Sequence, residues 1–225
     1  MIHTLVVATK NRGKLVELRA LLEGLPVKIV AMDDVLRPPL VVVEDGTTFA
    51  ENAAKKARAV AAATLSLSLA DDSGLEVDAL SGRPGVCSAR FAHERATDAE
   101  NNAALVAALQ AVAGTPATDG FTARFRCVLA LVDPYSMQGE GETAFAEGVC
   151  EGAITLSARG SFGFGYDPLF LVAGHGKTMA ELSEVEKNAV SHRAGACLAL
   201  RPVLARMLVQ REETIRRVGQ ATSPG

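Results

Sequence analysis

Residues 5–22 read LVVATKNRGKLVELRALL, and a change of hydrophobic period within this stretch decides the fold class. The apolar residues 5–8 have the length and composition of a short buried strand. A polar turn at 9–13 follows, after which leucines recur at the spacing of one helix face. A strand that leads through a glycine-containing turn into an amphipathic helix is typical of α/β proteins.

The same alternation continues along the chain. The pattern predicts a strand at 27–31 and two long strands at 124–133 and 142–150, antiparallel across the loop 134–141. Four capping boxes, in which a Ser or Thr and a Glu three residues later satisfy each other's backbone amides, mark helix starts. They begin at Thr48, Thr97, Thr178 and Ser183, and they predict helices at 49–65 and 98–113 and short helical pieces within 179–188.

The C-terminal part is predicted to be one helix over 192–212 that turns Leu198, Val203 and Leu204 inward. Pro202 should kink this helix or mark a turn near it. Residues 33–47, which contain two adjacent prolines, are predicted to be a loop with a short extended piece. We expect one α/β domain over 1–212 and a flexible tail over 213–225.

Composition limits the function. The chain has 225 residues, 48% of them hydrophobic, which suffices for one large domain or two lobes with a proper core. Its 23 basic and 26 acidic residues give a net charge of −3, so we expect neither a nucleic-acid partner nor a membrane surface. No apolar run approaches the ~20 residues of a membrane span, and no secretory signal is visible. A cytoplasmic protein is the expectation.

The four cysteines are scattered, and none stands at metal-ligand spacing from another Cys or a His. Each lies among Ala, Val or Leu, so we expect buried thiols that behave as small hydrophobes. Neither a zinc site nor a disulfide framework is expected. Gly174–Thr178 is similar to a phosphate-binding loop, but Leu171 stands where its first glycine would be required.

The first polar cluster is the turn between the opening strand and helix. A glycine lets the backbone approach a ligand, a helix start offers free amides to an anion, and a lysine adds a mobile charge suited to phosphate. The candidate binding residues are Thr9, Lys10, Asn11, Arg12, Gly13 and Lys14. Taken alone, this pattern is also that of an Asn-capped helix with lysines in solvent.

Two acidic clusters follow. Asp71 and Asp72 come after an apolar run, and adjacent carboxylates are costly unless a cation or a proton lies near them. Mg²⁺ is the natural partner, with Glu44 as a further oxygen ligand and Lys56 on the next helix flanking a metal–phosphate group. Because neighbouring side chains of a strand point to opposite faces, one aspartate can hold metal while the other anchors the loop.

The last polar cluster combines aromatic rings with hydrogen-bonding groups near a helix start. Stacking for affinity and directed donors for choice are what recognition of a purine edge requires. Its candidate residues are Phe164, Gly165, Tyr166, Asp167, Lys187, His192 and Arg193, joined by Ser73 after the aspartate pair. His192 alone would more often be a structural histidine.

With these clusters identified, the chain closely resembles the non-canonical purine nucleoside triphosphate pyrophosphatases, the inosine triphosphate pyrophosphatase family. Eight motifs over 1–205 carry the resemblance, in family order. They are Thr9-x-Asn11-x-Gly13-Lys14-x-x-Glu17, Glu44-x-Gly46-x-Thr48-Phe49-x-Glu51-Asn52-Ala53-x-x-Lys56-Ala57, Ala70-Asp71-Asp72-Ser73-Gly74-Leu75, Pro84-Gly85-Val86-x-Ser88-Ala89-Arg90, Arg124-Phe125-x-Cys127, Gly163-Phe164-Gly165-Tyr166-Asp167-Pro168-x-Phe170, Lys177-Thr178-x-Ala180-Glu181-Leu182 and Glu186-Lys187-Asn188-x-x-Ser191-His192-Arg193.

The resemblance implies an elongated α/β fold with a mixed central sheet, flanking helices and two lobes around a long substrate cleft, assembled as a homodimer. It implies Mg²⁺-dependent hydrolysis of ITP, dITP and XTP to the monophosphate and pyrophosphate. Asp72 would be the general base and a metal ligand, and Glu44 the companion metal ligand. The residues of the phosphate and purine clusters, with Lys56 and Ser73, would contact the substrate.

Two alternatives stay open. Maf-like nucleotide pyrophosphatases also open with a strand, a polar turn and a helix, but they carry a Ser-Pro-Arg-Arg type turn where this chain has residues 11–14, Asn-Arg-Gly-Lys. A non-catalytic nucleotide-binding module would be expected to lose Asp71, Asp72 or Glu44, and all three are present. These residues favour an enzyme.

Overall fold

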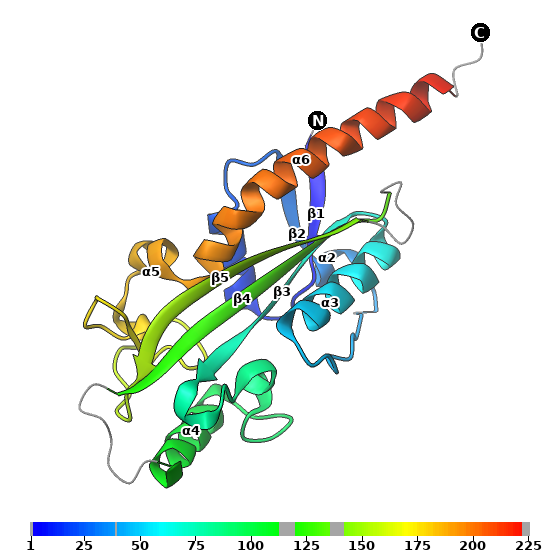
Figure 1. The fold of residues 1–225 in the computed structure, drawn as a ribbon. Helices are drawn as coiled ribbons and strands as arrows, with labels where there is room; N and C mark the ends of the chain where they lie inside the picture. Colours follow the sequence, from blue (N-terminus) through cyan, green and yellow to red (C-terminus); the bar gives the residue numbers. More distant parts are fainter. Residues whose placement is uncertain (1, 39, 113–119, 136–141, 222–225) are drawn as a thin grey trace.

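A computed structural model of the chain describes residues 2–38, 40–112, 120–135 and 142–221, and its centre is a mixed β-sheet (Figure 1). The strands are β1 (His3–Val7), β2 (Val27–Ala31), β3 (Leu67–Val77), β4 (Phe121–Asp133), β5 (Glu142–Ile154) and β6 (Phe170–Val172). Their order across the sheet is β2-β1-β3-β4-β5-β6. β1 pairs in parallel with β2 and β3, and the remaining neighbours are antiparallel.

Helices cover both faces of this sheet. They are α1 (Arg12–Leu21), α2 (Met32–Val35), α3 (Phe49–Thr64), α4 (Asp98–Val112), α5 (Glu184–Val190) and α6 (His192–Ala221), with three short 3₁₀ helices, η1 (Asp78–Leu80), η2 (Gly85–Arg90) and η3 (Met179–Glu181). All four predicted capping boxes are present, two of them at the starts of α3 and α5. No helix of the described ranges is both long and apolar enough to cross a membrane.

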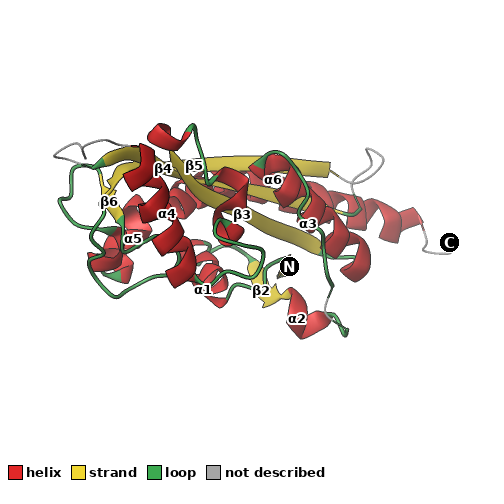
Figure 2. Ribbon diagram, turned by 90° about the horizontal axis from the view of Figure 1, so that it is seen from below, coloured by secondary structure: helices red, strands yellow, loops and turns green. Residues whose placement is uncertain are grey.

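The core has three parts that divide the molecule into two lobes. At one end, α1 and α6 pack on one face of the sheet around Leu18 and Leu129, while α3 covers the opposite face through Ala57. At the other end, α4 and the segment around β6 enclose a separate core that includes Leu105 and Phe170. Figure 2 shows α4, α5 and β6 at the end away from α3. The long strands β3, β4 and β5 run through both lobes and join them.

β1 is much shorter than β3, and this difference opens the space for a site. The two strands pair only as far as Val7 with Leu69, after which the chain leaves β1 and turns into α1. Beyond Leu69, β3 continues for eight residues to Val77, paired with β4 alone on one side. The other edge of β3 is therefore left without a strand at the level where the two lobes meet.

The structure corrects three expectations about the elements. Asp71 and Asp72 lie inside β3 and not after its end, because pairing with β4 carries the strand through this polar stretch. The 33–47 segment contains the short helix α2 at its start. The final helix does not stop at 212: α6 continues through Pro202 to Ala221, so most of the predicted tail is helical.

Two side chains lie opposite to their predicted environments. Leu198 is 72% exposed and not inward, whereas Leu204 is buried as predicted. Cys87 is exposed, unlike the other three cysteines, because it lies on η2 and not on a strand or a long helix. Parts of the predicted loop and tail, 136–141 and 222–225, lie outside the described residues.

Candidate active site

A cavity that is partly open to solvent lies where the two lobes meet, and charged, polar and aromatic side chains line it together. Predicted residues that line it are Asn11, Lys14, Ser73, Phe164, Gly165, Tyr166, Asp167, Lys187, His192 and Arg193. Lining residues that sequence reasoning did not assign to the site are Gly74, Ser88, Ala89, Asp98, Asn101 and Phe125.

The turn after β1 is built as the sequence predicts. Asn11 caps α1, since its side-chain oxygen accepts a hydrogen bond from the Lys14 backbone N–H at 3.0 Å. Thr9 fixes the turn by accepting from the Asn11 N–H at 3.1 Å. Lys10 and Arg12 are exposed and stand outside the cavity wall. The turn therefore presents a capped helix start and two exposed cations, Lys10 and Arg12, beside the cavity.

Gly13 is required where it stands. A Cβ on this residue would lie 2.9 Å from Cδ1 of Phe164, closer than carbon atoms approach without displacement. The missing side chain thus lets the Phe164 ring rest against the start of α1. This contact joins the phosphate-type turn to the predicted purine cluster.

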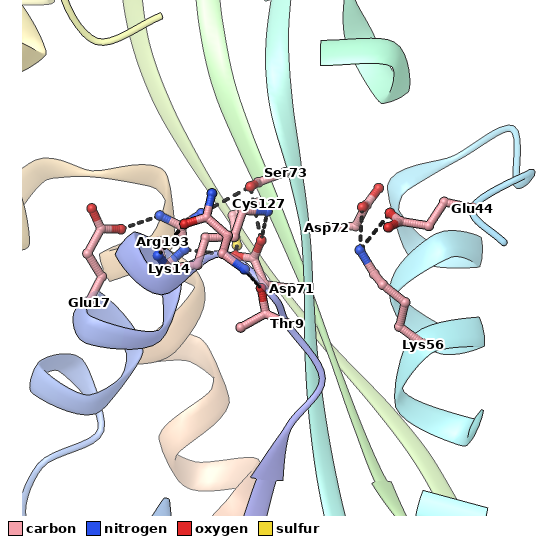
Figure 3. A network of polar contacts seen from close by, with 11 residues as sticks. Thr9, Lys14, Glu17, Glu44, Lys56, Asp71, Asp72, Ser73, Cys127 and Arg193 are labelled. Carbon is pink, nitrogen blue, oxygen red and sulfur yellow. Dashed lines mark hydrogen bonds and ion pairs between the residues drawn. The ribbon is translucent and has the colours of Figure 1, made fainter. Parts of the chain in front are cut away.

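Asp71 is the centre of a buried polar network on the α1 and α6 side of β3 (Figure 3). Its Oδ1 accepts hydrogen bonds from Lys14 and from Ser73 Oγ at 3.0 Å, and its Oδ2 from Arg193 Nε at 2.8 Å and Cys127 Sγ at 3.1 Å. Burial by itself would raise the pKa of Asp71, but the Arg193 and Lys14 cations hold that pKa well below 3.8. Asp71 is therefore ionised at neutral pH.

The network extends through alternating charges toward the other lobe. Arg193 also bonds to Glu17, and Glu17 pairs with Lys187 Nζ at 2.9 Å. Lys187 in turn donates to Asp167 Oδ2 at 2.7 Å. Together with Lys14 and Asp71, the chain of contacts contains three cations and three carboxylates, which explains how charged groups are tolerated at this depth. Glu17 was missed as a site residue, although it closes the first motif of the family resemblance.

A smaller group lies on the opposite side of β3, toward α3 (Figure 3). Lys56 Nζ donates to Glu44 Oε2 at 2.8 Å and to Asp72 Oδ1 at 2.7 Å. Burial raises the pKa of Asp72 to about 6, against the opposing effect of Lys56. Burial also acts on Glu44, but there Lys56 outweighs it, so the pKa of Glu44 is lowered. The structure thus brings together Glu44, Lys56 and Asp72, which the sequence analysis assigned to the metal and phosphate end of the site.

The oxygens of Glu44 and Asp72 suit a hard divalent cation. Within the described ranges, no three His, Cys, Asp or Glu side chains gather as a complete metal cage. Mg²⁺ rarely needs one, since it commonly binds one or two carboxylates together with substrate phosphates and water. Two carboxylates that already share a cation, Lys56, are therefore a donor set that fits Mg²⁺.

The purine-type end of the cavity lies around His192 and Phe164. The His192 ring stacks on Phe125, with ring centroids 4.9 Å apart and an angle of 19° between the planes. Its Nδ1 is buried without a hydrogen-bond partner in the described structure. Burial and the neighbouring Arg193 keep the pKa of His192 well below 6.5, so the ring is neutral. The Nδ1 atom of this neutral imidazole can donate a hydrogen bond to a ligand in one tautomer and accept one in the other.

The loop that carries Phe164 is fixed by Asp167. Oδ2 of Asp167 accepts from the Phe164 backbone N–H at 3.1 Å as well as from Lys187. Gly163 allows this arrangement, because its φ is +78° and a Cβ there would lie 2.0 Å from the same oxygen. Lys187 Nζ stands 5.0 Å from the centroid of the Phe164 ring. Burial raises the pKa of Asp167 despite its ion pair with Lys187.

The sheet, the lobes and the cavity define a mixed α/β protein with a charged site beside the middle of the sheet. The chain belongs to the Ham1 family, whose family model matches residues 5–203. Proteins named dITP/XTP pyrophosphatase from Shouchella clausii and Geobacter sulfurreducens are 49% and 50% identical to it, over 90% and 87% of this chain and 96% and 93% of their own lengths.

Solved structures show the same likeness. A HAM1 protein from Coxiella burnetii is 41% identical with a TM-score of 0.79, and the match covers 91% of this chain and 99% of that one. A nucleoside-triphosphatase, dITP/XTP pyrophosphatase, from Mycobacterium abscessus is 42% identical with a TM-score of 0.67, over 87% of this chain and 97% of that one. The predicted fold and family are confirmed.

Proposed function

We propose that this protein hydrolyses the bond between the α and β phosphates of dITP, XTP and ITP, releasing the monophosphate and pyrophosphate. One observation carries the proposal: three successive residues of β3, Asp71, Asp72 and Ser73, connect the cavity between the lobes to a pair of carboxylates bridged by Lys56. The relatives named dITP/XTP pyrophosphatase, with about half of their residues identical, support the same reaction.

The base would bind between Phe164 and the groups at the start of α6. Stacking on the ring supplies affinity, and donors from Lys187, His192 or Arg193 would meet the 6-oxo group of hypoxanthine or xanthine. Adenine would turn its 6-amino group toward a donor instead. A lost buried hydrogen bond costs about 1–3 kcal/mol, or roughly 5- to 150-fold in selectivity per contact.

The triphosphate would lie along the turn 9–14, with Lys14 and the exposed Lys10 and Arg12 as cations and the start of α1 as an amide donor. Lys56 would contact the phosphates from the opposite side. In this arrangement Lys14 and Lys56 would each bind a phosphate oxygen of the substrate in addition to the carboxylates that they contact in the present structure.

Glu44 and Asp72 would hold Mg²⁺. When bound, the ion would neutralise negative charge on the phosphate oxygens, a major part of phosphoryl-transfer catalysis. Asp72 would orient the attacking water and take its proton on a carboxylate oxygen. Lys56 would hold the Asp72 and Glu44 side chains in place. No covalent intermediate with the protein is required.

The test is pyrophosphate release from ITP, XTP, dITP, GTP, ATP and dTTP, each with Mg²⁺ and with EDTA. We expect pyrophosphate and not orthophosphate, from the first three substrates, and only with Mg²⁺. Release from dTTP in place of ITP would favour a Maf-like activity. Tight binding of ITP without turnover would contradict the proposal and indicate a nucleotide sensor.

We further propose a homodimer in the cytoplasm, on the basis of the family resemblance. Light scattering after size-exclusion chromatography should give twice the chain mass at micromolar concentration. A monomer at that concentration would contradict the assembly without affecting the proposed reaction.

A further inference from the structure

Two side chains near the start of α4 form hydrogen bonds with the loop that carries Phe164. The Gly165 backbone N–H donates to Asp98 Oδ2 at 2.7 Å, and the Gly165 carbonyl accepts from Asn102 Nδ2 at 2.9 Å. Residues 98 and 102 are four apart, so they share one face of the helix. Both backbone groups of one residue are thus bound by two side chains of a single helix.

The neighbours of Gly165 are bound to different lobes. On one side, the Phe164 ring rests on Gly13 of α1 and lies near Lys187 of α5. On the other side, the Tyr166 hydroxyl donates to the Ser88 carbonyl of η2 at 2.8 Å. The hydrogen bonds from α4 to Gly165 therefore help to set where the neighbouring Phe164 ring lies against α1.

α4 also holds a second wall of the cavity. Asn101 donates to the Ala89 carbonyl at 3.1 Å and accepts from the Ala92 N–H at 3.0 Å. Ala89 and Asp98 both line the cavity. The side chains of residues 98, 101 and 102 thus attach two separate cavity walls, the Phe164 loop and the end of η2, to one rigid element.

We propose that Asp98 and Asn102 are positioning residues for base recognition, which act through Gly165 by setting the place of the Phe164 ring. This role rests on the proposed function, because it assumes that the ring stacks on a purine. Among the described residues, no hydrogen bond or ion pair joins the clamp formed by Asp98 and Asn102 to Lys56, Glu44 or Asp72, and the loop meets the 9–14 turn through the Phe164 ring on Gly13. A defect in the clamp should therefore weaken base binding much more than phosphate binding.

The expected kinetic effect follows from when the base contacts are made. Stacking is the same in the ground state and the transition state, so its loss raises KM and leaves kcat nearly unchanged. Asp98→Ala removes a charge-assisted hydrogen bond and should raise KM for ITP roughly tenfold or more. Asn102→Ala removes a neutral one and should raise KM roughly three- to tenfold.

Glu100→Gln is the matched control. Glu100 lies in the same first turn of α4, and its replacement removes the same charge from the helix start, but its carboxylate bonds to Thr97 and not to the loop. Gln can still accept from the Thr97 N–H. Asp98→Asn is the conservative variant, because its amide oxygen can still accept from Gly165 N–H, so we expect KM between wild type and Asp98→Ala.

The experiment measures KM and kcat for ITP, the melting temperature, and by calorimetry the separate Kd values of IMP and pyrophosphate. We expect the two alanine variants to weaken IMP by the same factors as KM, with the pyrophosphate Kd and kcat changed less than twofold. An equal loss of IMP and pyrophosphate affinity, an unchanged IMP Kd, or a Glu100→Gln defect as large as that of Asp98→Ala would overturn the proposal.

The wild-type protein separates the two hypotheses. Wild-type protein that releases no pyrophosphate from any purine triphosphate would refute the proposed function. Active wild-type protein with clamp variants of unchanged IMP affinity would instead refute the positioning role.

Discussion

Asp71 and Asp72 are neighbours in one strand, yet they lie in opposite electrostatic environments. Asp71 faces α1 and α6 and accepts four hydrogen bonds, two of them from cations, and its pKa is well below 3.8. Asp72 faces α3 and Lys56, and burial raises its pKa to about 6. Burial raises the pKa of both carboxylates. Two bonded cations, Arg193 and Lys14, outweigh this effect at Asp71, whereas the single bonded cation Lys56 does not outweigh it at Asp72. The Asp71 side is a fixed framework, while in the proposed mechanism the Asp72 side would hold the metal ion and take the proton of the attacking water.

The largest expected effect is on turnover, in Asp72→Asn. Loss of the proposed base should lower kcat by about 10²–10⁴-fold. Nucleotide affinity should largely persist, because the framework on the other side of β3 is untouched. Single-turnover kinetics and the Kd of ITP check this; a kcat within tenfold of wild type would remove Asp72 from the mechanism.

Asp71→Asn should act on stability first. It leaves Arg193 and Lys14 without their shared carboxylate, and breaking a buried pair in this way costs about 3–5 kcal/mol. Urea unfolding should show this loss, together with weaker binding of both IMP and pyrophosphate. If Asp71→Asn instead kept its stability and lost only kcat, the contrast between the two aspartates would be wrong.

Arg193→Lys tests whether the framework also serves selectivity. Arg193 bonds to Asp71, Glu17 and Ser73 through three separate guanidinium nitrogens, Nε, Nη1 and Nη2, a planar spacing that the single nitrogen of a lysine cannot reproduce. The ITP-to-ATP ratio of kcat/KM should fall roughly tenfold. The buried contacts of Arg193 also predict a lower melting temperature for this variant. A ratio equal to that of wild type would refute the selectivity role.

The smallest effect concerns pH and His192. The unfolded chain takes up a proton on this histidine near pH 6.5, whereas the folded protein resists it, since burial and Arg193 lower the pKa. Stability should therefore fall as the pH drops below 6.5, by at most about 1.4 kcal/mol per pH unit from this group. His192→Gln should show a shallower fall of melting temperature between pH 7 and 5. Parallel curves for the two proteins would contradict this.

Local signals in the sequence were sufficient for much of the fold. The capping boxes at Thr48 and Ser183 predicted the starts of α3 and α5, because each is formed by residues three positions apart. The end of α6 was not predicted, because none of residues 209–217 is buried and so no core-facing pattern marks the helix as far as Ala221. Leu198 was misassigned for a different reason, since its exposure depends on how α6 lies on β5.

In the site, the sequence identified residue types that carry chemistry but not the residues that hold them. Cys127 and Glu17 contact Asp71 and Arg193 across 56 and 176 positions of the chain. A buried thiol and a helical glutamate have no local signature of such contacts. Glu17, Ser88, Phe125 and Cys127, which were all missed, stand within motifs of the family resemblance, and that is the signal by which they could have been included among the site residues.

The placement of the two aspartates in mid-strand has a consequence for hydrogen exchange. Amides of β3 and β4 that are bonded in the ladder around Asp72 and Val128 can exchange only when the sheet opens, so they should be among the slowest to take up deuterium. Residues 163–167 belong to a loop, where local opening suffices. Binding of a nucleotide should therefore slow deuterium uptake in the loop and leave the strand that carries the proposed catalytic carboxylate almost unchanged.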